Sequence, residues 1–238
     1  MKKHVFYSEL AYLCGLFLIA LGVVLTEKAD FGVSMIVAPA YLLYRWLNPI
    51  FSFFTFGMAE YCFQAALLVL MGILLRGFRL SYLLSFATAV IYGFILDGLM
   101  LLGAFLPFTI ALRFVYYGAG LFLSSAGVSM MFHTYLSPEA YELFVKEVSA
   151  HFGIEIHRFK TRYDAISCIV GVIMSFCIYG MWHFVGVNWG TVFCTLINGR
   201  LIGAISSYYE RHWQFSDRLT WRPFFTGQPP VKTGVCQR

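Results

Sequence analysis

The chain has 238 residues, of which 60% are hydrophobic and 12% are charged. Because soluble proteins of this size carry about 25% charged residues, the composition excludes an ordinary soluble domain and predicts a multi-pass protein embedded in a lipid bilayer. The net charge is +5. The charged residues lie between apolar runs, which is typical of cytoplasmic loops and argues against nucleic-acid binding.

The first apolar run lies close to the N-terminus, where a signal peptide would also lie. No small-residue cleavage site follows it, so we expect it to remain as the first transmembrane helix. The runs long enough to span a bilayer are residues 9–26, 52–75, 80–106, 112–133, 164–186 and 188–208. They predict an all-α membrane protein with about six transmembrane helices, accompanied by two short half-helices or interfacial helices.

The first short segment covers residues 33–44 and is apolar apart from Ser34. Arg45 ends it after twelve residues, and Pro39 lies in its middle. A helix of that length rises ~18 Å, whereas the hydrocarbon core is ~30 Å thick. We therefore expect this segment not to cross the membrane.

The second short segment covers residues 137–153 and is amphipathic. Ser137 suits the cap of a helix, and Pro138 suits its first turn. One face carries Tyr141, Phe144, Val145 and Val148, and the opposite face carries Glu139, Glu142, Lys146 and Ser149. We expect this helix to lie at the membrane interface or to dip in only partly, with its carboxylates turned away from the apolar face.

The basic residues predict the topology. They cluster at the N-terminus (Lys2, Lys3), before residue 164 (Arg158, Lys160, Arg162) and near the C-terminus (Arg211, Arg218, Arg222). All three clusters should be cytoplasmic, which requires an even number of crossings between the first two. Because the charged second segment cannot cross, the first should not cross either, and the count is six. We expect a protein of the cell (inner) membrane with cytoplasmic N- and C-termini.

The two halves of the chain share a sequence pattern. GLFLIALGV at residues 15–23 matches GLFLSSAGV at residues 120–128, an offset of 105. Each copy is followed by a short helix and two long runs, so the halves cover about 9–106 and 112–208. With three crossings per half, the second copy is inverted, as in many transporters. Residues 1–208 would form one transmembrane domain, and residues 209–238 a cytoplasmic basic and aromatic tail.

Two stretches carry a resemblance to a family. ALGVVLTEKADFGVSMIVAPAYLL resembles the first-helix signature of the YczE/YitT-type bacterial membrane proteins, in which a glycine-bearing helix leads into a small-residue turn and a short apolar segment. GVNWGTVFCTLINGRLIGAI resembles their last-helix pattern. The family is largely uncharacterised, so the resemblance implies the fold more than a function.

Polar residues inside apolar runs are the candidate binding residues, because a charge at membrane depth is costly unless it is paired or hydrated. They are Glu60, Gln64, Asp97, Asp164, Asn198 and Arg200. Glu60 suggests a proton or cation site, with Gln64 one turn away; the alternative is a carboxylate hydrogen-bonded across the bundle. Asp164 suits either a binding residue or an interfacial helix cap.

Asp97 and Arg200 fall in the last helices of the two halves, which the repeat would bring together. We therefore expect an ion pair between them. It would serve either as a charge relay or substrate anchor, or as a fixed pair that holds the halves together.

The sequence favours a transporter or permease for a small molecule, whose partners are the bilayer and its substrate. The alternative is a non-transporting accessory or assembly factor that acts with a cytoplasmic partner. Phosphate-binding glycine loops, G-x-S-x-G and H-E-x-x-H motifs and C-x-x-C pairs are all absent. We therefore expect no enzyme, cofactor or metal site. A homo-oligomer is compatible with the sequence.

Overall fold

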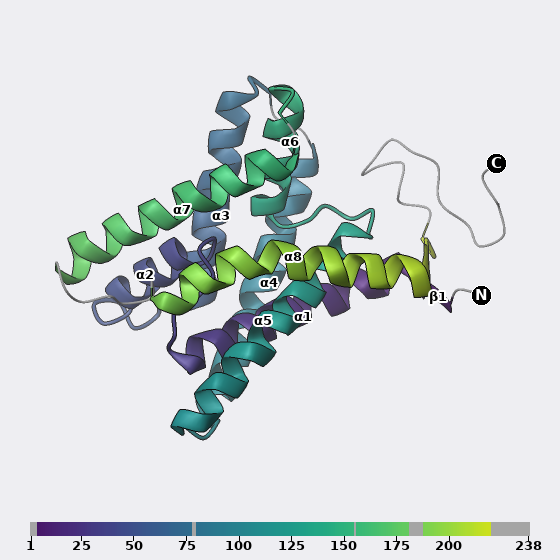
Figure 1. Cartoon of the computed structure of the whole chain (residues 1–238). Coiled ribbons are helices and arrows are strands. Elements are labelled where there is room, and N and C mark those ends of the chain that lie inside the picture. Colours follow the sequence, from purple (N-terminus) through teal and green to yellow (C-terminus); the bar gives the residue numbers. More distant parts are fainter. Residues whose placement is uncertain (1–3, 78–79, 155, 181–187, 220–238) are drawn as a thin grey trace, which may run out of the picture.

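The computed structural model describes residues 4–77, 80–154, 156–180 and 188–219. These residues form eight helices and two short strands, arranged as in Figure 1. The long helices are α1 (Ser8–Ala29), α3 (Phe56–Leu74), α4 (Leu80–Gly103), α5 (Ile110–Phe132), α7 (Ile156–Tyr179) and α8 (Trp189–His212). The short helices are α2 (Ala38–Leu47) and α6 (Ala140–His151), and the strands are β1 (His4–Tyr7) and β2 (Trp213–Ser216).

Five of the helices in the described part of the chain are long and apolar enough to cross a membrane: α1, α3, α4, α5 and α7. Large apolar side chains on the outer surfaces of these helices are exposed, including Phe94 (72% exposed), Leu101 (72%) and Ile110 (75%). A surface of this kind is suited to lipid rather than water. The protein is therefore embedded in a membrane. Helix α8 is equally long, but Asn198 and Arg200 interrupt its apolar run.

Local signals set several helix starts. The Thr55 hydroxyl caps α3 by accepting a hydrogen bond from Met58 N at 3.2 Å. Asn188 caps α8 in a reciprocal arrangement with Thr191. Each cap satisfies backbone N–H groups that have no partner within their own helix.

Helices α1 and α5 cross in antiparallel directions at the centre of the protein, through glycines. A methyl group added to Gly15 would lie 3.0 Å from the Gly127 carbonyl oxygen, and one added to Gly22 would lie 2.7 Å from that of Gly120. The offset of 105 residues relates Gly15 to Gly120 and Gly22 to Gly127. Exchanging the two halves therefore converts one glycine contact into the other, as a two-fold axis through the crossing requires.

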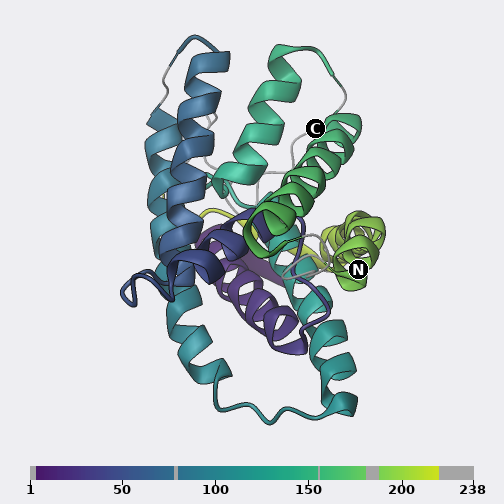
Figure 2. The same cartoon turned by 90° about the vertical axis from the view of Figure 1, so that its left-hand side faces the viewer.

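Four further helix contacts follow the same exchange, whereas the α3–α4 contact has no comparable counterpart between the described parts of α7 and α8. Helix α1 packs on α4 and α5 packs on α8, while α3 packs on α6 and α2 packs on α7. Each short helix thus rests on a long helix of the opposite half. Figure 2 shows α3 and α4 side by side, with α6 and α7 beside them and α8 viewed nearly along its axis.

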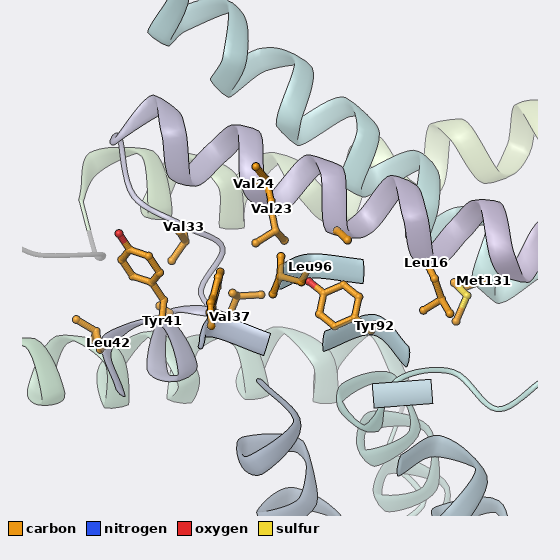
Figure 3. Packing of buried hydrophobic residues seen from close by; sticks show 13 residues of the cluster. Leu16, Val23, Val24, Val33, Val37, Tyr41, Leu42, Tyr92, Leu96 and Met131 are labelled. Carbon is orange, nitrogen blue, oxygen red and sulfur yellow. The ribbon is translucent and has the colours of Figure 1, made fainter. Parts of the chain in front are cut away.

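The main apolar core lies where α1, α2, α4 and α5 meet, as Figure 3 shows. Leu16, Leu42 and Leu96 are fully buried there, and Tyr92 is 1% exposed. The loop before α2 contributes Val33 and Val37 to the same cluster. The first short segment is therefore anchored inside the protein, although its ten-residue helix rises only ~15 Å and is too short to span, as predicted.

The structure differs from the expectation for the charged face of the second short segment. Glu139 is 6% exposed and the Glu142 side chain 14%, so these carboxylates do not face water. The expected apolar face is buried as predicted, through Tyr141, Phe144 and Val148. Because α6 packs against α3, α4 and α7, both of its faces are covered near its start. It lies within the helix assembly, in the place that α2 occupies in the first half.

The two ends of the described chain are joined by a parallel strand pair, in which His4 lies opposite Trp213. The Ser8 hydroxyl donates a 2.9 Å hydrogen bond to Asp217, and the Glu9 carboxylate accepts one of 2.8 Å from Leu219 N. We call β1, β2 and these two contacts the terminal clasp. The expected tail boundary at residue 209 lies inside α8, and the next few residues belong to the folded domain.

Candidate functional site

A cavity lies between the starts of the two short helices. Its volume is about 70 Å³, and its lining includes Ser34, Tyr92, Glu139, Tyr141 and Lys160. A second, larger cavity of about 350 Å³ adjoins it. The two share the lining residues Ser34, Ile36, Lys160, Cys194 and Asn198. We call them the inner cavity and the outer cavity.

The loops that precede the short helices are held by polar contacts from the opposite half. The hydroxyls of Ser85 and Thr88 on α4 donate to the carbonyl oxygens of Pro138 (2.7 Å) and Ser137 (3.1 Å). At the equivalent place, Gly190 N on α8 donates to the Phe31 carbonyl oxygen at 2.9 Å. These contacts position the first turns of α2 and α6 against the cavities.

Two side chains of α3 hold the first turn of α6. The Tyr141 hydroxyl donates to Glu60 Oε2 at 2.9 Å, and the Ala140 N–H donates to Gln64 Oε1 at 3.1 Å. Both Glu60 and Gln64 are fully buried. The Ala140 N–H is one of the groups that a helix leaves unsatisfied at its start, and Gln64 supplies its partner.

Several polar atoms in this region have no hydrogen-bond partner within the described structure. They are Glu60 Oε1, Gln64 Nε2 and Glu139 Oε1, all fully shielded from solvent. Buried polar atoms normally have partners, so this cluster has unused capacity for a proton, a water or a cation.

The electrostatic environment of Glu139 favours its neutral form. Burial raises its pKa well above the usual range, and the neighbouring carboxyl groups of Glu142 and Glu60 raise it further. Burial also raises the pKa of Glu142, although Lys160 acts in the opposite direction. The Lys160 Nζ lies 3.9 Å from Glu142 Oε1, so this lysine is engaged with Glu142.

Asp164 lies on the other side of the cavities, on α7. It lines the outer cavity beside Ser34 and Met35, close to the start of α2, and its Oδ1 has no hydrogen-bond partner in the described structure. Because α7 begins at Ile156, Asp164 is well inside the helix and is not its cap. Each half therefore places a carboxylate from a long helix near the short helix of the other half.

The expected ion pair between Asp97 and Arg200 is wrong. The Asp97 carboxylate accepts 2.7 Å hydrogen bonds from the Thr55 hydroxyl and from Gly57 N. It therefore satisfies the start of α3, its partner within the same half. Arg200 is exposed and lines the outer cavity. The prediction failed because α1 and α5, rather than the last helices of the halves, form the central crossing.

The remaining candidate residue, Asn198, is partly buried on α8 and lines both cavities. Its side-chain oxygen accepts a 2.7 Å hydrogen bond from the Ser125 hydroxyl of α5. Glu60, Gln64, Asp164, Asn198 and Arg200 thus lie in or next to one region, whereas Asp97 lies apart from it.

Comparison with known families gives a match over residues 6–207, to a family of unknown function, DUF6198. The chain belongs to DUF6198. Comparisons with curated proteins and with solved structures gave no match. The DUF6198 match includes both short helices and both cavities, so the candidate site belongs to the part shared with the family. It ends before β2.

Sequence reasoning missed Glu139, Glu142 and Lys160 as site residues. The 105-residue offset contained the signal, because it relates residues 137–142 to residues 32–37 at the start of the apolar first short segment. In this DUF6198 chain the two segments occupy related places, and the charges of the second therefore face the cavity.

Proposed function

We propose that this DUF6198 protein is a six-span transporter or permease of the cell (inner) membrane, and that its small-molecule substrate binds in the inner cavity. The observation that carries this proposal is the exchange symmetry of the two halves, with both short helices starting at one cavity. Inverted repeats with broken or short helices at a central site are a common transporter architecture.

The arrangement offers a route to alternating access. The α1–α5 glycine crossing lies on the pseudo-two-fold axis, and each half contributes a short helix that rests on the other half. If the two halves exchange conformations, the cavity opens first to one side of the membrane and then to the other. The outer cavity, which residues of α7 and α8 line, continues from the inner cavity and offers a path to it.

The terminal clasp supports an even number of crossings. Because β1 and β2 pair directly, the first and last described elements must lie on the same side of the membrane. Five spans would place them on opposite sides, which supports our proposal that α8 is the sixth. The lysines and arginines near both ends make that side the cytoplasm.

The state of the buried charges favours transport over the accessory-factor alternative. In a solid scaffold, buried carboxylates should be fully paired, whereas Glu139 lines a cavity with an unpartnered oxygen. The resemblance to YczE/YitT-type proteins agrees with the proposed fold and adds no substrate.

Side-specific labelling tests this proposal without a known substrate. Asn198→Cys, in a cysteine-free background, is treated with a membrane-impermeant maleimide in right-side-out and in inside-out vesicles. We expect labelling from both sides, because alternating access exposes the cavity to each in turn. Labelling from one side only, or from neither, would overturn the proposal.

A matched pair of variants checks the topology in the same vesicles. Lys28→Cys and Ile50→Cys flank the first short segment, and Ile50 is 62% exposed. We expect both to react from the same side, outside the cell. Reaction from opposite sides would contradict the six-span count.

A further inference from the structure

The inner cavity has an uncompensated acidic group. Glu139 is 6% exposed, lines the cavity and has an unpartnered Oε1. The nearest lysine, Lys160, is engaged with Glu142. A buried carboxylate that has an unpartnered oxygen and lines a cavity requires either a proton or a cation.

Lys160 of α7 is the one lysine in the described lining of the cavity, and it is paired with Glu142. The other described groups that face Glu139 from the surrounding elements are acidic or neutral. They are Glu60 from α3, Tyr12 from α1, Tyr92 from α4 and Glu142 from α6 itself. Gln64 of α3 contributes a neutral amide. A positive ligand would therefore experience attraction from several sides, while an anion would be repelled.

We propose that the inner cavity binds a small organic cation with a primary ammonium group, which Glu139 accepts in exchange for a proton. This inference rests on the proposed transport function and names its substrate class. The protonated Glu139 carboxyl loses H⁺, and the resulting carboxylate pairs with R–NH₃⁺. One positive charge enters as one leaves, so the exchange at this site is electroneutral.

The rest of the lining suits the apolar part of such a ligand. Ile19, Val23, Val37, Leu121 and Val128 contribute alkyl surface, and the rings of Tyr92 and Tyr141 border the same space. Aromatic faces attract ammonium groups. A volume of about 70 Å³ holds only about two to five water-sized groups, which limits the ligand to a few heavy atoms.

Thermal unfolding of the purified full chain in detergent tests the ligand class. The probes are ethylammonium, acetamide, acetate and glycine, which are cationic, neutral, anionic and zwitterionic, compared at equal ionic strength. We expect ethylammonium alone to raise the melting temperature of the protein. Below the pKa of Glu139, its apparent Kd should increase ~10-fold for each unit decrease in pH, because one proton competes with one cation.

Two variants locate the effect. Glu139→Gln should abolish the ethylammonium shift, while Glu210→Gln, the same change at an exposed position on α8, should retain it. If Glu139→Gln does not fold, proton release by the wild type replaces it. Adding ethylammonium to weakly buffered protein should release up to one proton per bound cation.

The outcomes separate this inference from the transport proposal. Stabilisation by acetate, acetamide or glycine without ethylammonium, or by no probe at all, would overturn the cation site. Stabilisation by ethylammonium that persists in Glu139→Gln would overturn the role of Glu139. Neither result changes the Asn198→Cys labelling, which alone decides alternating access.

Discussion

The Tyr141 hydroxyl donates a 2.9 Å hydrogen bond to the Glu60 carboxylate, and this contact joins a short helix of one half to a long helix of the other. Both residues are buried, at 3% and 0% exposure. Because the other Glu60 oxygen has no partner in the described structure, the carboxyl group depends on Tyr141 for its solvation. The contact links the chemistry of the cavity wall to the packing of the halves.

Removing the Tyr141 hydroxyl should therefore be costly. We expect Tyr141→Phe to lower the free energy of unfolding by about 1–3 kcal/mol, because Glu60 then has no donor. In a Glu60→Gln background the same change should cost less, since a neutral amide is less expensive to leave unpaired. Denaturation by SDS in mixed micelles measures both. Tyr208→Phe, at a residue that is 55% exposed, is the matched control, and equal losses in both backgrounds would contradict the coupling.

The glycine crossing of α1 and α5 should tolerate no side chain. A methyl group at Gly22 would lie 2.7 Å from the Gly120 carbonyl oxygen, and one at Gly120 would lie 2.8 Å from that of Gly22. We expect Gly22→Ala and Gly120→Ala each to destabilise the protein by about 1–3 kcal/mol through overpacking. Gly118→Ala is the control, because nothing lies within 4 Å of its added methyl group. A loss in the control as large as in the other two would rule out the close approach as the cause.

Asp97 and Arg200 should behave independently. Asp97→Ala removes the acceptor of the Thr55 hydroxyl and of Gly57 N, so we expect a loss of about 1–2 kcal/mol. Arg200→Gln, at an exposed position, should change stability by less than about 0.5 kcal/mol. The double variant should show the sum of the two effects in the same unfolding assay. If the double variant were more stable than Asp97→Ala alone, the two residues would be coupled, and the conclusion that they form no ion pair would be wrong.

Stability should depend on pH through Glu139. Its pKa in the folded protein lies above the ordinary value of 4.5, so the folded state holds the proton more tightly than the unfolded state does. The stabilisation is complete below the ordinary pKa and is lost as pH rises through the raised one. We expect the melting temperature of the wild type to fall over that interval, and that of Glu139→Gln to fall less. A steeper decline in the variant would refute this assignment.

The sequence predicted the helices that are long and apolar enough to span a bilayer, such as α3 and α4. It also contained the 105-residue offset that relates Gly15 to Gly120. The short segment at 33–44 could be interpreted as non-spanning because length alone excludes it. Burial of a charge is harder to predict, since it depends on partners from other helices. The sequence pattern turned Glu139 and Glu142 away from the apolar face of their helix, because it does not show that Gln64 of α3 and Lys160 of α7 pack against them.

The partner of Asp97 illustrates the same limit. Two opposite charges at membrane depth suggested an ion pair, but a helix start supplies N–H and hydroxyl donors that satisfy a carboxylate equally well. Thr55 and Gly57 are such donors, and they belong to the neighbouring helix rather than to the symmetry-related one. Only the arrangement of helices decides between these partners.

The terminal clasp can form only at the end of synthesis, because it joins the first described element of the chain to the last one. Ser8 emerges from the ribosome long before Asp217, its hydrogen-bond partner 209 residues later. Until β2 has been synthesised, β1 therefore has no strand to pair with. The clasp closes last, after α8 is complete. A nascent chain that stops before residue 213 leaves Ser8 and Glu9 without these partners and β1 as a bare edge. In such a truncated chain neither edge of β1 is paired, whereas in the complete chain β2 covers one of them.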